Sequence, residues 1–247
     1  MRSGDGAFAP GSPTGPTGGP PPIMLFGMSF AVAMFANGGK DVLLGVDRRW
    51  VDGERGHYRV LSDAGTKSIA INTRNGLAFT GNAELIALIA SRLYDDTSLF
   101  VEPYTAVLER IEGLPESLGL DTEEIIHRLD EIVPDARRNY RAECMLSIIL
   151  AGCMHGKTVM AWWCQESQWK SSLNWYGEEQ YVATLPPESL GNNDVLTGTH
   201  MCLKLRVLPE ERIRSAIGFL SSQGAIQTVS SQYVIRRRSR AFAEEEY

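Results

Sequence analysis

The stretch that decides the fold is "GMSFAVAMFANGGKDVLLGVDRR", Gly27–Arg49. Two apolar runs, "SFAVAMFA" and "VLLGVD", flank the sequence "NGGK", and Asn-Gly between such runs is a strong signal for a β-hairpin. Runs that are apolar at nearly every position are typical of strands buried on both faces. We therefore predict a buried hairpin that begins near Ser29 and ends in a polar cluster at Asp47 and Arg49.

The composition limits the classes of function. The chain has 247 residues, 43% of them hydrophobic and 22% charged, which suits one large or two small globular domains. A net charge of -6 argues against nucleic acid as a partner, because phosphate binding needs a basic surface. No apolar run reaches the length of a membrane span, so we expect no membrane partner. The four cysteines form no CxxC pair and the histidines have no zinc-ligand spacing, so we expect no metal and a reducing cytoplasm.

The two ends of the chain differ from its middle. Residues 1–22 are rich in Gly and Pro and cannot bury enough apolar surface to offset the entropy of ordering. We expect residues 1–27 to be a disordered leader, a propeptide, or a stretch upstream of the true start codon. One domain should follow at 28–240. The basic run 236–240 and the acidic tail 241–247 read as solvated.

Beyond the first hairpin, strands and helices come in groups. A second hairpin is predicted at "SIAIN" and "LAFTG". Two helices follow, one capped by Asn82 and one capped by Asp121, and Pro134 is expected to kink or end the second. Between them we expect at most one short helix.

The chain then returns to strands. "CMLSIILAGCM" and "TVMAWWCQ" predict a third hairpin, "KSSLNWYG" and "QYVATL" a ragged fourth, and "NNDVLTGT" a short strand. A helix at "PEERIRSAIGFLSSQG" and a last strand complete the order. Grouping of this kind predicts an α+β fold of packed layers rather than a doubly wound sheet. No GxGxxG or Walker loop is present, so we expect no cofactor.

Several motifs, taken in order, resemble the β-type proteasome subunits, including bacterial HslV and Anbu. They are "SFAVAMFANGG", "GVDRR", "TKSIAI", "GLAFTGNAEL" and "SIILAGCMHGK", and the resemblance runs from about Ser29 to Val234. It implies a four-layer αββα sandwich of the N-terminal-nucleophile (Ntn) hydrolase type. It also implies a peptide or protein substrate, identical subunits in a ring or helical stack, and a bacterial cytoplasmic location. The resemblance leaves open whether the protein has an ATPase partner.

The resemblance makes Ser29 the candidate nucleophile. An Ntn hydrolase uses its first residue twice: the side-chain oxygen attacks, and the free α-amine takes the proton. Ser29 is therefore either a nucleophile once the Met28–Ser29 bond is gone or an ordinary strand serine. Translation from Met28 followed by methionine removal would expose it, and so would self-cleavage of a longer chain.

The same resemblance assigns roles around Ser29. Lys67 would stabilise the alkoxide, Asp47 would pair with Lys67, and Arg49 would brace Asp47. The alternative is a salt bridge of little energy on the surface. A backbone N–H at Gly81 would bind the oxyanion, or the glycine would serve only the turn.

A second cluster follows the family less closely. Thr197 stands for a family serine, Ser230 is kept, and Gln227 replaces a family aspartate. Phe79 falls where the family places the floor of its specificity pocket. Loss of the aspartate leaves three functions open: a peptidase of the proteasome type, a catalytically silent ring or scaffold subunit, and an Ntn amidase for a small molecule.

The last expectation concerns assembly. The two helices capped by Asn82 and Asp121 carry apolar stripes, and the segment Trp162–Trp175 is rich in aromatic side chains. We predict a homo-oligomer of at least six subunits, held by these helices and the aromatic segment.

Overall fold

A computed structural model describes residues 23–26, 29–54, 57–100, 103–112, 118–138, 140, 145–165, 167–189 and 191–239. The leader up to residue 22, the residue Met28, Cys144 and the acidic tail 241–247 lie outside the described residues. The expectations about them remain predictions.

The first sheet has five strands in the order β1-β11-β2-β3-β12. The predicted hairpin forms its centre, with β2 paired antiparallel to β3. β1, which falls inside the predicted leader, runs parallel to β11, and the other pairs are antiparallel. The strands are β1 (Ile23–Phe26), β2 (Ala31–Ala36), β3 (Asp41–Asp47), β11 (Tyr181–Leu185) and β12 (Tyr233–Ser239).

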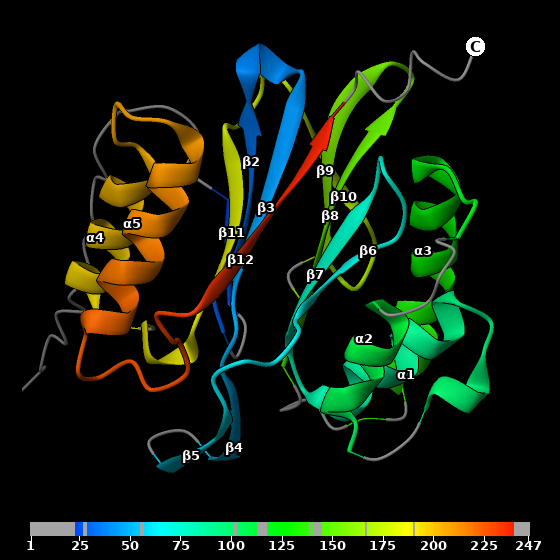
Figure 1. Ribbon diagram of the computed structural model, residues 1–247, viewed down its shortest axis with the longest axis horizontal. Helices are drawn as coiled ribbons and strands as arrows, with labels where there is room; N and C mark the ends of the chain where they lie inside the picture. The colour runs from blue at the N-terminus through cyan, green and yellow to red at the C-terminus, as the bar shows by residue number, and fades with distance from the viewer. Residues whose placement is uncertain are drawn as a thin grey trace, which may run out of the picture.

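The second sheet also has five strands, in the order β10-β9-β8-β7-β6, and all its pairs are antiparallel. A separate two-stranded ribbon, β4–β5, projects beyond the sheets (Figure 1). The strands are β4 (Trp50–Glu54), β5 (His57–Ser62), β6 (Ser68–Ala70), β7 (Gly76–Gly81), β8 (Leu146–Met154), β9 (Lys157–Trp163) and β10 (Ser172–Trp175).

Five α-helices occur in the described part of the chain, together with three short 3₁₀ turns. In Figure 1, α4 and α5 lie on the outer side of the first sheet, and α1, α2 and α3 lie on the outer side of the second. They are α1 (Ala83–Leu93), α2 (Thr105–Glu112), α3 (Thr122–Arg138), α4 (Asn193–Leu203) and α5 (Pro209–Ser222), with turns η1 (Asn37–Gly39), η2 (Thr97–Leu99) and η3 (Pro187–Ser189).

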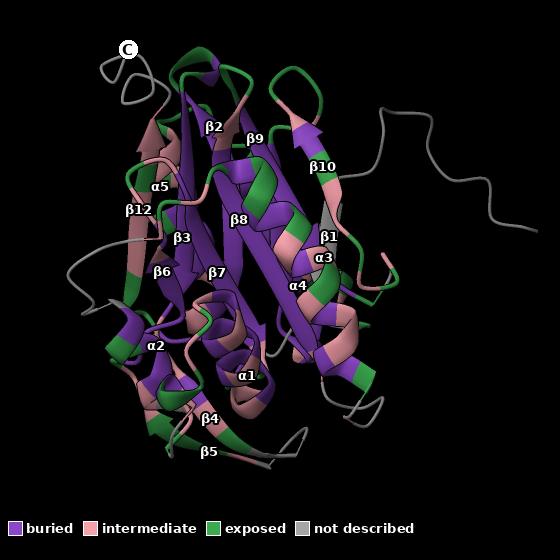
Figure 2. Cartoon of the chain, turned by 90° about the vertical axis from the view of Figure 1, so that its right-hand side faces the viewer, coloured by how far each residue is buried: buried purple, intermediate pink, exposed green. Residues whose placement is uncertain are grey.

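The period-2 pattern of β2 shows how the two sheets share the core. Ala31, Ala33 and Phe35 pack in an apolar cluster with Ile149 and Met160 of the second sheet. The residues between them, Val32, Met34 and Ala36, pack with side chains of α4 and α5, because successive side chains of a strand point to opposite faces. Figure 2 shows these central strands as almost entirely buried. This double burial explains the unbroken apolar run of the sequence.

The turn of the first hairpin is a 3₁₀ turn at Asn37–Gly39. Asn37, Gly38 and Gly39 all have positive φ, between 49° and 80°. A Cβ at Gly39 would lie 2.2 Å from the Tyr176 ring, so this position needs glycine for space as well as for conformation.

Several local predictions hold. The second hairpin is β6–β7, and the third is β8–β9. The Asn82 side chain accepts a hydrogen bond from the Leu85 N–H at 2.9 Å, and Asp121 accepts one from Glu124 N–H at 2.8 Å, so both caps form.

Two predictions need correction, and a third is narrowed. The segment "NNDVLTGT" is no strand: it belongs to α4, because the Asn192 side chain caps a helix by accepting the Val195 N–H. The segments "KSSLNWYG" and "QYVATL" form no hairpin, since β10 and β11 lie in different sheets. Pro134 does not end helix α3, which continues to Arg138 with Ala136 buried in the apolar cluster of α1–α3 and the second sheet; a kink at Pro134 stays a prediction.

None of the described helices is long and apolar enough to cross a membrane.

Candidate functional site

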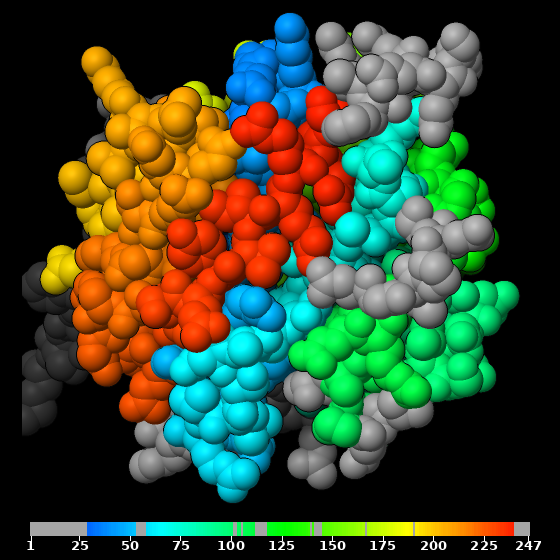
Figure 3. Space-filling view, in the orientation of Figure 1, coloured from blue at the N-terminus to red at the C-terminus, as the bar shows by residue number. Residues whose placement is uncertain are grey.

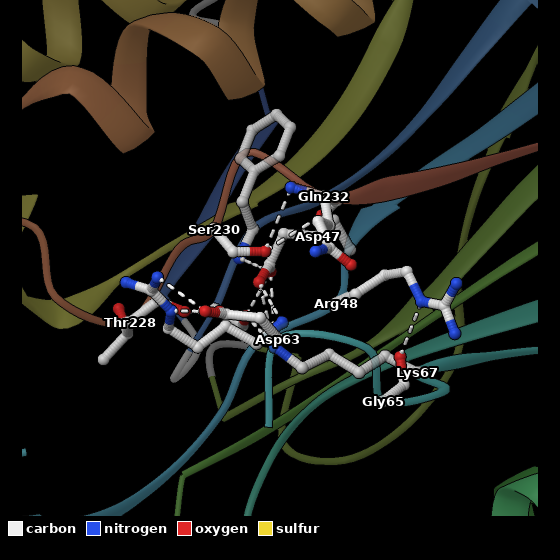
Figure 4. A network of polar contacts seen from close by, with 12 residues as sticks. Asp47, Arg48, Asp63, Gly65, Lys67, Thr228, Ser230 and Gln232 are labelled. Atoms are coloured by element: carbon white, nitrogen blue, oxygen red, sulfur yellow. Dashed lines mark hydrogen bonds and ion pairs between the residues drawn. The ribbon is translucent and has the colours of Figure 1, made fainter. Parts of the chain in front are cut away.

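Three predicted residues from three elements meet at one end of the paired sheets. Ser29 precedes β2, Asp47 ends β3, and Lys67 precedes β6. The Lys67 ammonium donates hydrogen bonds to Ser29 Oγ and to both carboxylate oxygens of Asp47, the latter at 3.3 and 3.2 Å. The Ser29 hydroxyl in turn donates to Asp47 Oδ1. Figure 4 shows the Lys67 side chain reaching toward Asp47.

Asp47 organises this end of the hairpin. Besides the contacts to Ser29 and Lys67, it accepts the N–H of Phe30 at 3.1 Å and that of Arg49 at 2.9 Å. It has no exposed surface. Because a buried carboxylate is costly unless its lone pairs are filled, these donors fix the position of Asp47 within the site.

The electrostatics of Lys67 are unusual for a lysine. Its side chain is 3% exposed, and burial lowers the pKa of its ammonium below the ordinary value of 10.5, while the Asp47 carboxylate opposes that shift. The ammonium also lies 5.4 Å from the centre of the Trp50 ring. A lysine held in this way can donate to a nearby oxygen and give up its proton more readily than a lysine in water.

A small cavity of about 20 Å³ adjoins Ser29, and its walls include Trp50, Lys67 and Gly81. That volume suits about one water molecule. Gly81 has φ +127°, and a Cβ there would lie 2.1 Å from the Met145 carbonyl oxygen. The structure thus places the backbone of Gly81 at the wall beside the serine, where no larger residue fits.

Phe79, the predicted floor of a specificity pocket, does not line the cavity at Ser29. Phe79 is fully buried in the cluster between the second sheet and α1–α3, and Trp50, 6% exposed, belongs to the same cluster. The indole N–H of Trp50 is buried without a hydrogen-bond partner in the described structure. Trp50 was not anticipated as a site residue.

Of the other predicted residues, Arg49 lines the cavity beside Ser29, whereas Ser230 and Thr197 do not. Ser230 is buried, but its hydroxyl bonds with the backbone of Gln232. Thr197 lies on the exposed side of α4 and is not among the residues that line the cavity. Arg49 forms a two-point ion pair with Asp63 and donates to the Gln227 carbonyl at 3.0 Å.

Sequence reasoning missed residues that approach the site from β11 and from the two loops that follow it. Thr184 Oγ1 accepts the Ala31 N–H at 2.9 Å, beside the nucleophile. The Thr228 carbonyl oxygen lies 3.4 Å from Ser29 Oγ, and Glu188 bonds to the same loop. Ser189 is fully buried with a hydroxyl that pairs with none of the described groups. No local sequence pattern marks these residues, because their contacts span up to about 200 positions.

The described residues contain no group of three or more His, Cys, Asp or Glu side chains that could hold a metal ion.

The fold and the buried Ser29–Lys67–Asp47 cluster together define a class of protein: the chain has a proteasome-like fold. HslV from Trypanosoma brucei is similar in structure, with a TM-score of 0.53 at 13% identity over 85% of this chain and 99% of that one. Anbu (ancestral β-subunit) from Yersinia bercovieri is similar too, with a TM-score of 0.55 at 11% identity over 88% of this chain and 85% of that one. No protein-family model matches the sequence, and no curated protein matches it. At such low identity, the similarity establishes the fold.

Proposed function

We propose that this protein is an Ntn hydrolase of the proteasome type, which cleaves peptide or amide bonds with Ser29 as its N-terminal nucleophile. In this proposal the two sheets and their outer helices form the αββα sandwich of that class, within the domain 28–240. The observation that carries the proposal is the buried contact of Lys67 with Ser29 and Asp47.

The chemistry follows from these positions. Once the Met28–Ser29 bond is cleaved, the α-amine of Ser29 takes the proton of its own hydroxyl as Oγ attacks the substrate carbonyl. The Lys67 ammonium stabilises the negative charge that develops on Oγ, and a backbone N–H at Gly81 stabilises the oxyanion. Collapse of the intermediate expels the amine product, which takes the proton from the α-amine. Water then hydrolyses the ester on Ser29.

The direct test is the variant Ser29→Ala. Because Ser29 contributes chemistry and little packing volume, the variant should fold and assemble normally, while hydrolysis and labelling by a fluorophosphonate are abolished. Lys67→Ala should lose nearly as much activity. A Ser29→Ala protein with the wild-type hydrolysis rate would show that the nucleophile is elsewhere.

A second candidate is a catalytically silent scaffold subunit of the same fold. Two observations favour it: Gln227 stands where the resemblance predicts a carboxylate, and the cavity at Ser29 holds no more than about one water molecule. A silent subunit would show no labelling at Ser29, even in a chain that begins at this residue. The same labelling experiment therefore separates the two candidates.

We also propose that identical subunits assemble in a ring or stack in the bacterial cytoplasm, with an ATPase partner left open. The exposed surface suggests an additional contact region for this assembly. The apolar stripes of α1 and α3 are buried in the chain's own core, and Trp162 and Trp163 are 9% and 0% exposed. Four exposed apolar side chains lie around the α4–α5 connection: Met201, Leu205, Val207 and Leu208. Within the predicted aromatic segment, Leu173 is exposed as well.

A further inference from the structure

A carboxylate outside the predicted site bonds to the loop that touches the nucleophile. Glu188 lies in η3, the turn between β11 and α4, and is half-buried. Its Oε1 accepts the Gln227 N–H at 3.2 Å, and its Oε2 accepts the Thr228 hydroxyl at 3.1 Å. One carboxylate thus fixes two neighbouring residues of the loop that leads to β12.

This loop reaches Ser29 directly. Thr228 is fully buried, and its carbonyl oxygen lies 3.4 Å from Ser29 Oγ, as a second acceptor beside Asp47 Oδ1 for the one hydroxyl proton. On its other side, Arg49 donates to the Gln227 carbonyl at 3.0 Å and is itself held by Asp63. Figure 4 shows Asp63 and Thr228 on one side of the cluster and Lys67 on the other. The loop is therefore clamped from two directions beside the serine.

The start of the Glu188 turn is also tied to the nucleophile. In the sheet register Thr184, near the end of β11, is paired with Ala31, two residues after Ser29. Glu188 follows Thr184 by four residues, in η3. Glu188 therefore links the segment after β11 to the loop that carries Thr228.

We propose that Glu188 is the positioning residue of this site: through its bonds to Gln227 and Thr228, it holds the Thr228 carbonyl beside the Ser29 hydroxyl. The inference rests on the proposed function. In it, Glu188 touches no substrate and acts through Thr228. Its loss should slow acylation of Ser29 without weakening substrate binding.

The experiment measures the rate at which a fluorophosphonate labels Ser29 in the full chain, followed by intact mass, together with kcat and KM on a peptide amide. Because Glu188→Ala removes two hydrogen bonds to a charged group, it should slow labelling by about tenfold or more. KM should stay unchanged while kcat falls. Glu188→Gln retains one acceptor oxygen and should recover part of the rate.

Thr228→Val removes the hydroxyl that bonds to Glu188 and keeps the side-chain volume. It should slow labelling as well. Both residues act through one contact, so their effects should not add. The double variant Glu188→Ala/Thr228→Val should label within about twofold of the rate of the slower single variant. The matched control is Glu178→Gln, whose carboxylate accepts the Trp175 N–H at 2.9 Å on an exposed turn and should label at the wild-type rate.

The outcomes separate the two proposals. Wild-type labelling of a folded Glu188→Ala protein, or additive losses in the double variant, would overturn the role of Glu188 while Ser29→Ala still abolishes labelling. Equal labelling of Ser29→Ala and the wild type would overturn the proposed function, and the positioning role with it. If Glu188→Ala fails to fold, the volume-matched Thr228→Val and the near-isosteric Glu188→Gln decide the question.

Discussion

Neutralising Asp47 should expose how much the site depends on its buried ion pair. Asp47 has no exposed surface and Lys67 is 3% exposed, so Asp47→Asn leaves an ammonium buried without its counter-charge. Removing one partner of a buried ion pair typically costs about 3–5 kcal/mol. We expect a loss of this size in the free energy of unfolding at pH 7, measured by urea denaturation.

The loss should depend on pH, and its sign follows from Lys67. Burial lowers the pKa of Lys67 and Asp47 opposes that shift, so Asp47→Asn should lower the pKa further. Between the pKa of the folded protein and the ordinary value of 10.5, the unfolded chain binds more protons, so stability rises with pH. The difference in stability between Asp47→Asn and the wild type should therefore shrink as pH rises. This happens in the pH range where Lys67 is charged in the folded wild type and neutral in the folded variant. The limiting slope is about 1.4 kcal/mol per pH unit for one proton.

The opposite end of the same strand offers a matched control. Asp41, which begins β3, is 5% exposed and bonds with Asn37 and with Arg237 at 3.3 Å. Arg237 is half exposed and also pairs with Glu210, so Asp41→Asn should cost only about 1 kcal/mol. Equal losses in the two variants, or a pH-independent loss in Asp47→Asn, would refute the view of Lys67–Asp47 as a buried ion pair.

The remaining predictions concern the site wall, the chain start and assembly. Gly81→Ala should lose about 2 kcal/mol or more by urea denaturation, because its Cβ would meet the Met145 carbonyl at 2.1 Å at a φ of +127°. Gly119→Ala, which meets nothing within 4 Å, is the control, and equal losses would contradict the argument. The active protein should begin at Ser29, as read by intact mass; activity with Met28 still attached would contradict this. Light scattering of the folded protein at micromolar concentration should give at least six subunits, and Leu208→Asp, in the exposed apolar patch, should lower that number. A monomer mass for the wild type would refute this prediction.

Local sequence patterns predicted the parts of the fold that local physics decides. The hairpin at Asn37–Gly39 and the cap at Asn82 follow from turn and capping chemistry within a few residues. The prediction of a strand at the start of α4 was wrong for a related reason. "VLTGT" has few helix formers, and the cap that decides the segment is a single asparagine at residue 192.

The site divides in the same way. Ser29, Asp47 and Lys67 were predicted from motifs that resemble a known family, and the structure brings all three together. The bond of Glu188 to Thr228 links residues 40 positions apart and has no motif. Such contacts depend on the register of whole strands. Register is fixed by packing on both sheet faces, which a single sequence does not display.

Figure 3 shows one face of the molecule, where β12, in red, lies between the orange helix α5 and the cyan strands. Behind this surface the two sheets enclose an apolar cluster, and at one end of the paired sheets Asp47 and Lys67 bury two opposite charges. Replacing a buried ion pair by apolar side chains of similar volume often leaves a protein equally or more stable, so packing alone gives no reason for this pair. A chemical role accounts for the pair. Burial lowers the pKa of Lys67, and the Asp47 carboxylate holds the lysine against Ser29, beside a cavity the size of one water molecule. The same reasoning applies to the nearby half-buried Glu188, whose carboxylate bonds to the loop that touches that serine.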